Sequence, residues 1–192
     1  CVVSSERPRF DVVLRRVSEL TPSDAKMVPC GNLPHPKIGL HEYYFSPSEL
    51  VWKLWSSLVP EYVPPADGKF SSILVPTLDT VRSAWLLKTH IKALRPILFV
   101  GDSGTAKSVT VSHTLKHLPA DQYQTLFVNM SSRTSSKSLQ GIIESNVEKR
   151  VKGTYGPPVG KKLIMFIDDH NMPKVDTYGT QQPIALLKLL VE

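Results

Sequence analysis

Short apolar runs alternate with helical spacing in the second half of the chain. Runs at 97–100, 125–130 and 163–167 predict three strands, and their largely uninterrupted apolar character indicates burial on both faces. Helical spacing predicts helices at 107–118, at about 137–150 and from about 182 onward. Strands separated by helices of a dozen residues require right-handed parallel crossovers. The predicted fold class is therefore α/β with a parallel sheet.

Proline interrupts the pattern in the first half. Eleven of the 16 prolines and all three tryptophans fall within residues 1–96, which excludes long helices and central strands over most of that stretch. Residues 1–20 have helical spacing, and residues 50–58 fit a helix or an extended segment equally well. A cleaner helix is predicted from Thr77 to about Arg95, with its buried face formed by Val81, Ala84, Trp85 and Ile91.

The length, composition and net charge of the chain exclude several classes of protein. The 192 residues are 41% hydrophobic, which argues against wholesale disorder, and no apolar run approaches the roughly 18 residues of a membrane span. The net charge of +6 is divided evenly: residues 1–96 hold 12 basic and 9 acidic side chains, and residues 97–192 hold 11 and 8. Neither nucleic acid nor a membrane is therefore an expected partner. Two cysteines without metal spacing and the absence of a leader favour a reduced intracellular protein, and the ends suggest a piece of a longer chain.

A glycine-rich loop at 101–108 is the first candidate site. It follows a predicted buried strand and opens a helix, where backbone N–H groups can face a phosphate. Lys107 is expected to reach the β- and γ-phosphates, and the Ser108 hydroxyl to contact Mg²⁺. The usual pattern G-x-x-x-x-G-K-[ST] has glycine where this chain has Ala106, so one methyl group stands close to the expected phosphates.

Two acids end the third predicted strand, 61 residues after Lys107. Asp168 is expected to orient the Mg²⁺ shell, and Asp169 can position the attacking water. Asn129 and Arg133, at or just past the carboxyl end of a strand, are further candidates on the phosphate side. His113 and His117 have the spacing of a metal pair, but without a third ligand the favoured interpretation is solvent exposure.

Several segments resemble axonemal dynein heavy chains. The most specific are Asn171-Met172-Pro173 and 176–181 after the acid pair, joined by 73–82, 127–132 and 155–158. Together they resemble the third AAA+ module of the motor ring, over roughly residues 43–192. The resemblance implies an extended arm at 45–65, an arm or linker over 1–70, and the N-terminal part of an AAA+ large subdomain, with a P-loop three-layer core, over 71–192.

The resemblance also implies a site and a role. The nucleotide would be ATP or ADP with Mg²⁺. Asp168 and Ser108 would hold the metal, and Asp169 would take the place of the catalytic glutamate. The implied nucleotide-binding residues are Val75, Pro76, Gly101, Asp102, Ser103, Gly104, Thr105, Ala106, Lys107, Ser108 and Val109.

The implied setting is a minus-end-directed microtubule motor in the cytoskeleton of a cilium or flagellum. Neighbouring AAA+ modules would be direct partners, with intermediate or light chains and microtubules reached through the full-length protein. The implied role is regulatory, with slow hydrolysis. Further strands, a sensor residue, an arginine finger and a helical lid would follow residue 192, so the isolated chain is expected to be nearly inactive. A nucleotide-holding module without turnover, or an unrelated P-loop NTPase, remains open.

Overall fold

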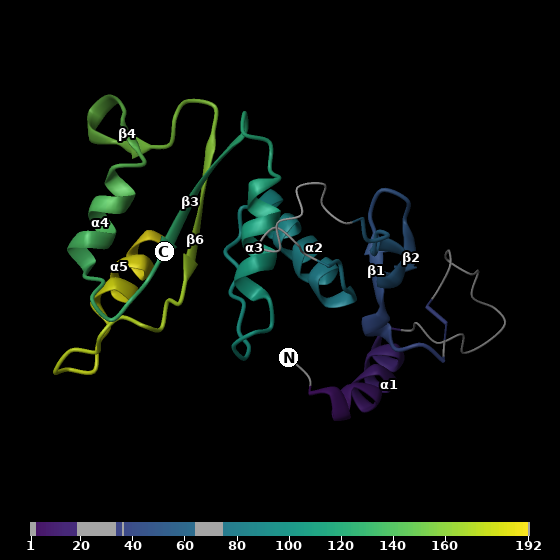
Figure 1. Cartoon of the computed structure of the whole chain (residues 1–192). Helices are drawn as coiled ribbons and strands as arrows, with labels where there is room; N and C mark the ends of the chain where they lie inside the picture. The colour runs from purple at the N-terminus through teal and green to yellow at the C-terminus, as the bar shows by residue number, and fades with distance from the viewer. Residues whose placement is uncertain (1–2, 19–33, 36, 64–74, 192) are drawn as a thin grey trace. The chain divides into compact units, whose positions relative to one another are not determined.

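The computed structural model describes residues 3–18, 34–35, 37–63 and 75–191 of the chain (Figure 1). Two compact units divide at Arg82 and Ser83, and each is described by itself. The domain division predicted at residue 70 falls outside the described residues and stays a prediction.

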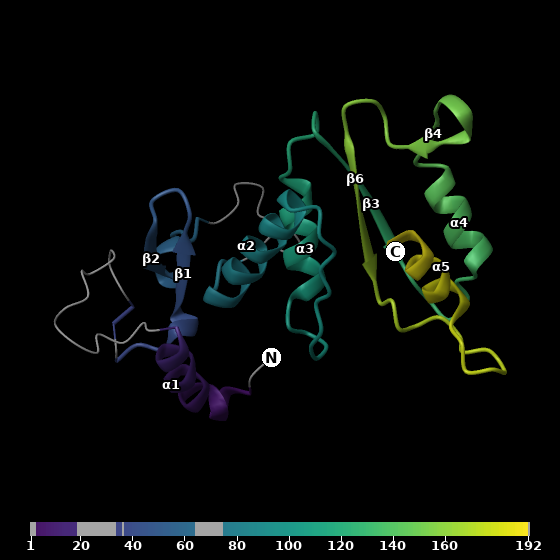
Figure 2. The same ribbon diagram turned by 180° about the vertical axis from the view of Figure 1, so that it is seen from behind.

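The second unit is built on two parallel strands, β3 (Tyr123–Asn129) and β6 (Lys162–Asp168). Helices α4 (Ser136–Glu144) and α5 (Gln182–Val191) lie on one side of this pair, and α3 (Lys107–Lys116) lies on the other (Figures 1 and 2). Helix α2 (Leu78–Lys92) enters the unit with its C-terminal part. The predicted parallel α/β arrangement is therefore confirmed.

Apolar side chains cover both faces of β6, as its unbroken apolar sequence predicts. Leu163, Met165 and Ile167 pack against a cluster formed by Leu126, Val128, Met130 and Leu139. Ile164 and Phe166 pack on the opposite face against a second cluster of Leu87, Val111 and Leu115. Leu87 is the buried residue of α2, whereas its four predicted core positions are only half-buried. Each face of β6 is covered by its own cluster of apolar side chains, so this strand lies at the centre of the unit.

The prediction of a strand at 97–100 is wrong. In the described part of the chain this segment forms no ladder with another strand. Ile97 and Phe99 join the cluster around Leu87, but Leu98 and Val100 are 66% and 82% exposed. Strand structure requires a hydrogen-bonding partner, and hydrophobic sequence alone does not supply one.

The helix predicted to reach residue 150 ends at Glu144 instead. The side chains of Ser145 and Asn146 both donate to the carbonyl of Ile142, at 2.8 and 2.9 Å. These side-chain donors replace the backbone donors that would continue the helix. The following residues form a short antiparallel pair of β4 (Glu148–Lys149) and β5 (Tyr155–Gly156), and β4 lies within the stretch predicted as helix.

The first unit contains a helix and a hairpin. Helix α1 (Arg7–Val17) confirms the helical spacing of residues 1–20, and β1 (Tyr43–Ser46) pairs antiparallel with β2 (Val51–Leu54). Of the two conformations left open for 50–58, the extended one is correct, although a 3₁₀ turn follows at Trp55–Leu58. Phe45 and Trp52 pack edge to face across the strands with centroids 5.5 Å apart, a cross-strand contact that an isolated helix could not make.

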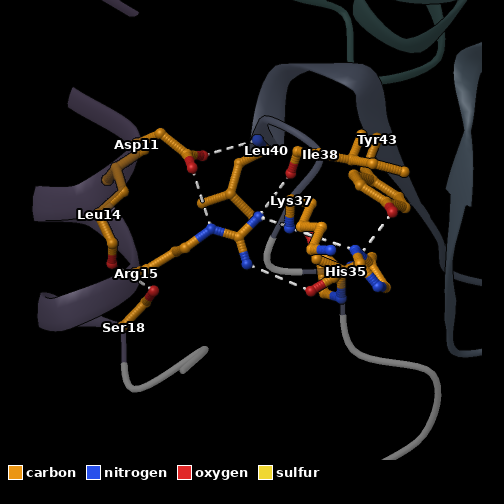
Figure 3. Close-up of polar contacts among 10 residues, drawn as sticks. Asp11, Leu14, Arg15, Ser18, His35, Lys37, Ile38, Leu40 and Tyr43 are labelled. Atoms are coloured by element: carbon orange, nitrogen blue, oxygen red, sulfur yellow. Dashed lines mark hydrogen bonds and ion pairs between the residues drawn. The ribbon is translucent and has the colours of Figure 1, made fainter. Parts of the chain in front are cut away.

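Arg15 joins α1 to the segment before the hairpin (Figure 3). Its side chain is 6% exposed and donates to the Asp11 carboxylate at 3.0 Å. The guanidinium also donates to three backbone carbonyls, those of Pro34, His35 and Ile38. Burial would raise the pKa of Asp11, but the Leu40 N–H and the Arg15 guanidinium outweigh it and hold that pKa below its ordinary value.

Replacement of Arg15 tests this junction. Arg15→Ala leaves the Asp11 carboxylate without its partner in the buried ion pair and removes one donor from each of three carbonyls. It is therefore expected to cost about 3–5 kcal/mol. Arg16→Ala, at an exposed position on the same helix, is expected to cost less than about 0.5 kcal/mol. Urea unfolding of the chain, followed by tryptophan fluorescence, measures both. Equal costs for the two variants would contradict the role given to Arg15.

The turn that leads into α3 holds Ala106, a residue with a side chain, in a backbone conformation that favours glycine. Ala106 precedes the helix with φ 58° and ψ 19°, the left-handed conformation. A Cβ atom in that conformation crowds the following carbonyl. The departure from the usual glycine at this position is therefore a source of local strain.

Ala106→Gly is expected to stabilise the chain by about 0.5–1 kcal/mol, because relief of the left-handed strain exceeds the added freedom of the unfolded chain. The matched control has the opposite sign. Ala185→Gly, at an exposed helical position in α5, should destabilise the chain by about 1 kcal/mol. Shifts of the urea midpoint provide the measurement, and destabilisation by Ala106→Gly would refute the strain.

Candidate nucleotide-binding site

The loop between residue 100 and α3 exposes a run of backbone donors. Among the described residues, none accepts a hydrogen bond from the N–H groups of Asp102 to Val109. Gly104 takes φ 79°, a conformation that bends the loop and that glycine adopts without strain. Consecutive free N–H groups ahead of a helix form a concavity suited to an anion. The sequence pattern predicts this arrangement.

Lys107 lies within that loop. Its ammonium group donates to the carbonyls of Gly101 and Asp102, at 2.8 and 2.5 Å, and to the Thr105 hydroxyl at 3.0 Å. The same hydroxyl donates to the Asp102 carbonyl at 2.8 Å. All three ammonium donors are therefore engaged by the loop itself, which keeps the positive charge beside the free N–H groups.

One hydrogen bond connects the loop to the acid pair. The Ser108 hydroxyl, in the first turn of α3, donates to Asp168 Oδ1 at the end of β6, at 2.9 Å. The two residues are 60 positions apart in the chain, and the sheet brings them together. A hydroxyl oxygen and a carboxylate oxygen in contact are the hard donors that Mg²⁺ prefers. The pair therefore fits the metal ligands expected from the sequence.

Asp169 marks the point where the chain leaves the strand. Its φ of 51° is left-handed, and its backbone N–H donates to Asp168 Oδ1 at 3.1 Å. Its side chain is exposed and makes no hydrogen bond to the described residues. Aspartate tolerates this backbone conformation better than glutamate does. An unengaged carboxylate beside the Ser108–Asp168 pair is free to orient a water molecule.

The two further phosphate-side candidates differ in position. Asn129 is directly opposite Asp168 in the parallel ladder, and the neighbouring Met130 N–H donates to the Asp168 carbonyl at 3.1 Å. Arg133 lies in the loop after β3 with an exposed side chain, and no contact joins its guanidinium to the described loop or acid residues. The structure thus brings Asn129 to the acid pair and leaves Arg133 apart from it.

The remaining candidates lie outside this group. Val75 and Pro76 belong to the first unit, so their assignment as nucleotide-binding residues stays a prediction. The rings of His113 and His117 lie 4.3 Å apart on the exposed side of α3.

Partial burial, followed by the charges of His117, Lys88 and Lys116, lowers the pKa of His113. Among the described residues no cluster of three or more His, Cys, Asp or Glu side chains could hold a metal. Both histidines are exposed, as the favoured interpretation of the sequence predicts.

The sequence did not reveal the role of Gln181, which binds the segment that follows the acid pair. Gln181 donates through Nε2 to the carbonyls of Asn171 and Pro173, at 2.9 and 2.6 Å. These two carbonyls belong to the segment that follows Asp169. The Met172 N–H of the same segment donates to the Asp169 carbonyl at 3.0 Å. The only signal in the sequence was the family-like motif at 171–181, which indicated no contact.

A known protein family and several known proteins are similar to this chain. A family described as the P-loop containing dynein motor region matches residues 62–192. The flagellar inner arm I1 dynein-1-alpha heavy chain of Chlamydomonas reinhardtii is 55% identical over 98% of the chain, and human dynein axonemal heavy chain 10 is 48% identical over 97%. Mouse dynein axonemal heavy chain 2 is 41% identical over 84%.

The chain spans only 4% of the length of each of these relatives. None of the helices in the described ranges is long and apolar enough to cross a bilayer. The family match covers the loop, the acid pair and both strands between them, and it accounts for the α/β core with its parallel strands. The chain therefore belongs to the P-loop-containing dynein motor region family.

Proposed function

We propose that this chain binds ATP or ADP with Mg²⁺ in the loop at 101–109. The observation that carries the proposal is the 2.9 Å hydrogen bond between Ser108 and Asp168. It unites the hydroxyl of the phosphate-binding motif with the acid of the second motif, as a shared metal ligand set requires. The family match supports nucleotide binding in general terms.

Each part of the loop has a separate task. The free N–H groups from Asp102 to Val109 bind phosphate oxygens, and Lys107 exchanges loop carbonyls for phosphate, a stronger charge-assisted partner. Ser108 and Asp168 hold Mg²⁺, which when bound neutralises charge on the phosphates. Val75 and Pro76 are also proposed to contact the nucleotide, as the family resemblance implies.

Asp169 is the proposed residue that orients the attacking water. Its backbone leaves the strand in a left-handed turn, and its carboxylate is one methylene shorter than that of the glutamate usual in AAA+ enzymes. A misplacement of about 1 Å in a positioning group can cost on the order of 10²-fold in rate. Hydrolysis at this site is therefore slow, and the module holds its nucleotide for long periods.

The proposed setting is the motor of an axonemal dynein heavy chain. The relatives are named as axonemal or flagellar heavy chains, and the motifs at 171–181 indicate the third AAA+ module. In that position the chain would regulate a minus-end-directed microtubule motor of the ciliary or flagellar axoneme. It would contact neighbouring modules, with intermediate or light chains and microtubules reached through the full-length protein.

A module that holds nucleotide with no turnover is the second candidate. The short reach of Asp169 and the strained Ala106 both favour it over a rapid ATPase. An unrelated P-loop NTPase is excluded by the family match.

Lys107→Ala tests the binding site. Loss of a charge-assisted contact to phosphate is expected to lower ATP affinity by about 10- to 100-fold in the complete module, without unfolding it. Lys116→Ala, on the exposed side of the same helix, is the matched control and should bind ATP normally. Calorimetric titration measures both. Equal affinity of Lys107→Ala and the unmodified protein would place the nucleotide elsewhere.

Asp169→Glu tests the reach of the acid. In a full-length heavy chain whose other nucleotide sites are disabled, the longer side chain is expected to raise residual ATPase activity by about tenfold or more. Asp169→Asn, which tolerates the same backbone conformation but lacks the charge, should abolish the residual activity. No change or a fall in rate with Asp169→Glu would show that reach does not limit hydrolysis.

A further inference from the structure

Among the described residues, the Thr105 hydroxyl is the one side-chain group that bonds to the Lys107 ammonium. Its oxygen accepts from Lys107 at 3.0 Å, and its hydrogen is donated to the Asp102 carbonyl at 2.8 Å. The other two acceptors of Lys107 are backbone carbonyls, those of Gly101 and Asp102. Backbone carbonyls are present whatever the residue type, so Thr105 is the part of this contact that the sequence determines.

The bond to Asp102 fixes the direction of the Thr105 hydroxyl. A hydroxyl group has one hydrogen and two lone pairs. Because the hydrogen points to the Asp102 carbonyl, the lone pairs remain for a donor, and Lys107 supplies that donor. Threonine is also branched at Cβ, which restricts rotation about χ1. The acceptor for the ammonium is therefore held in one direction before any ligand binds.

The side chain of Lys107 folds back over the start of the loop. A Cβ atom built on Gly101 would lie 3.7 Å from Thr105 Oγ1, 3.8 Å from Lys107 Cδ and 3.9 Å from Lys107 Nζ. The three residues thus lie together at one end of the loop. A lysine stem is flexible and gives up rotamer freedom when its ammonium is held. A fixed acceptor at this place keeps the charge beside the backbone N–H groups of the loop.

We propose that Thr105 is a positioning residue for Lys107, whose ammonium it retains in the loop while phosphate oxygens replace the two backbone carbonyls. An ammonium group has three donors. Two of them turn from the Gly101 and Asp102 carbonyls to phosphate, and the third stays on Thr105 Oγ1. One retained contact reduces the freedom that Lys107 loses on binding, and such preorganisation raises affinity. This inference rests on the proposed nucleotide site.

Two substitutions separate the hydroxyl of Thr105 from its shape. Thr105→Val keeps the branched side chain and removes both hydrogen bonds, while the Asp102 carbonyl keeps its Lys107 donor. Thr105→Ser keeps the hydroxyl and removes only a methyl group. Thr177→Val, at an exposed position in the loop between β6 and α5, is the matched control.

Acylation of lysine side chains by an N-hydroxysuccinimide ester of acetic acid tests the contact without nucleotide. In the nucleotide-free full-length heavy chain, Thr105→Val is expected to raise the acylation rate of Lys107 by about threefold or more, because the ammonium loses one of its three acceptors. Thr105→Ser and Thr177→Val should each leave that rate within about twofold of the unmodified protein. Lys116, exposed on the same helix, reports any general change in reactivity. An unchanged rate at Lys107 in Thr105→Val, measured by mass spectrometry, would overturn the proposal.

A double-mutant cycle shows whether Thr105 acts through Lys107. Calorimetry measures Mg²⁺-ATP affinity in the full-length heavy chain with its other nucleotide sites disabled. Thr105→Val is expected to weaken binding by about three- to tenfold, and Thr105→Ser should restore it to within about twofold. In a Lys107→Ala background, Thr105→Val should change the affinity by less than about twofold, because the group that it positions is gone. Equal effects of Thr105→Val in the two backgrounds, or no rescue by serine, would contradict the positioning role.

The single variants separate this inference from the proposed function. Weaker binding by Lys107→Ala with normal binding by Thr105→Val would refute the role of Thr105 and leave the nucleotide site in place. Normal binding by both variants would refute the nucleotide site, and the role of Thr105 would fail with it.

Discussion

The parallel pairing of β3 with β6 is the constraint on which the second unit depends. It aligns Asn129 with Asp168 at one edge of the sheet and brings Met130 N–H to the Asp168 carbonyl. It also presents two apolar faces, each covered by its own cluster of side chains. With β6 covered on both sides, Asp168 has a fixed position, and the hydroxyl of Ser108 reaches it from the first turn of α3. The loop and the acid pair meet because Val111 and Leu115 of α3 share a cluster with Ile164 and Phe166 of β6.

Backbone conformation explains how the site differs from its usual pattern. Ala106 and Asp169 both take positive φ values, and both stand where other P-loop or AAA+ proteins have a different residue. The two cases have opposite consequences. Alanine is strained where glycine would be relaxed, whereas aspartate suits a left-handed turn better than the longer glutamate. The same backbone feature thus disfavours one departure and favours the other.

Hydrogen bonds also hold the loop after the acid pair. The Asp168 carboxylate accepts from the Ser108 hydroxyl, and the Asp169 carbonyl accepts from the Met172 N–H. Gln181 donates to the Asn171 carbonyl in the turn that follows. These bonds join the segment after β6 to the strand end that carries the Ser108–Asp168 pair.

The sequence by itself determined the parallel α/β class, the presence of helices α3, α4 and α5, and the residues of the two motifs. These features follow from local hydrophobic periodicity, from the placement of glycine and proline, and from the residue types that the two motifs require. It did not determine that 97–100 lacks a ladder, because pairing depends on a partner strand and hydrophobicity does not reveal one. The early end of α4 depended on which donor reached the Ile142 carbonyl, a competition that the apolar spacing could not show.

Only the tertiary structure decided that Ser108 and Asp168 share a hydrogen bond, that Lys107 is engaged by its own loop, and that Gln181 binds the carbonyls after the acid pair. The first and last of these contacts are set by how strands and loops come together in space. Sequence spacing limits that geometry but does not fix it.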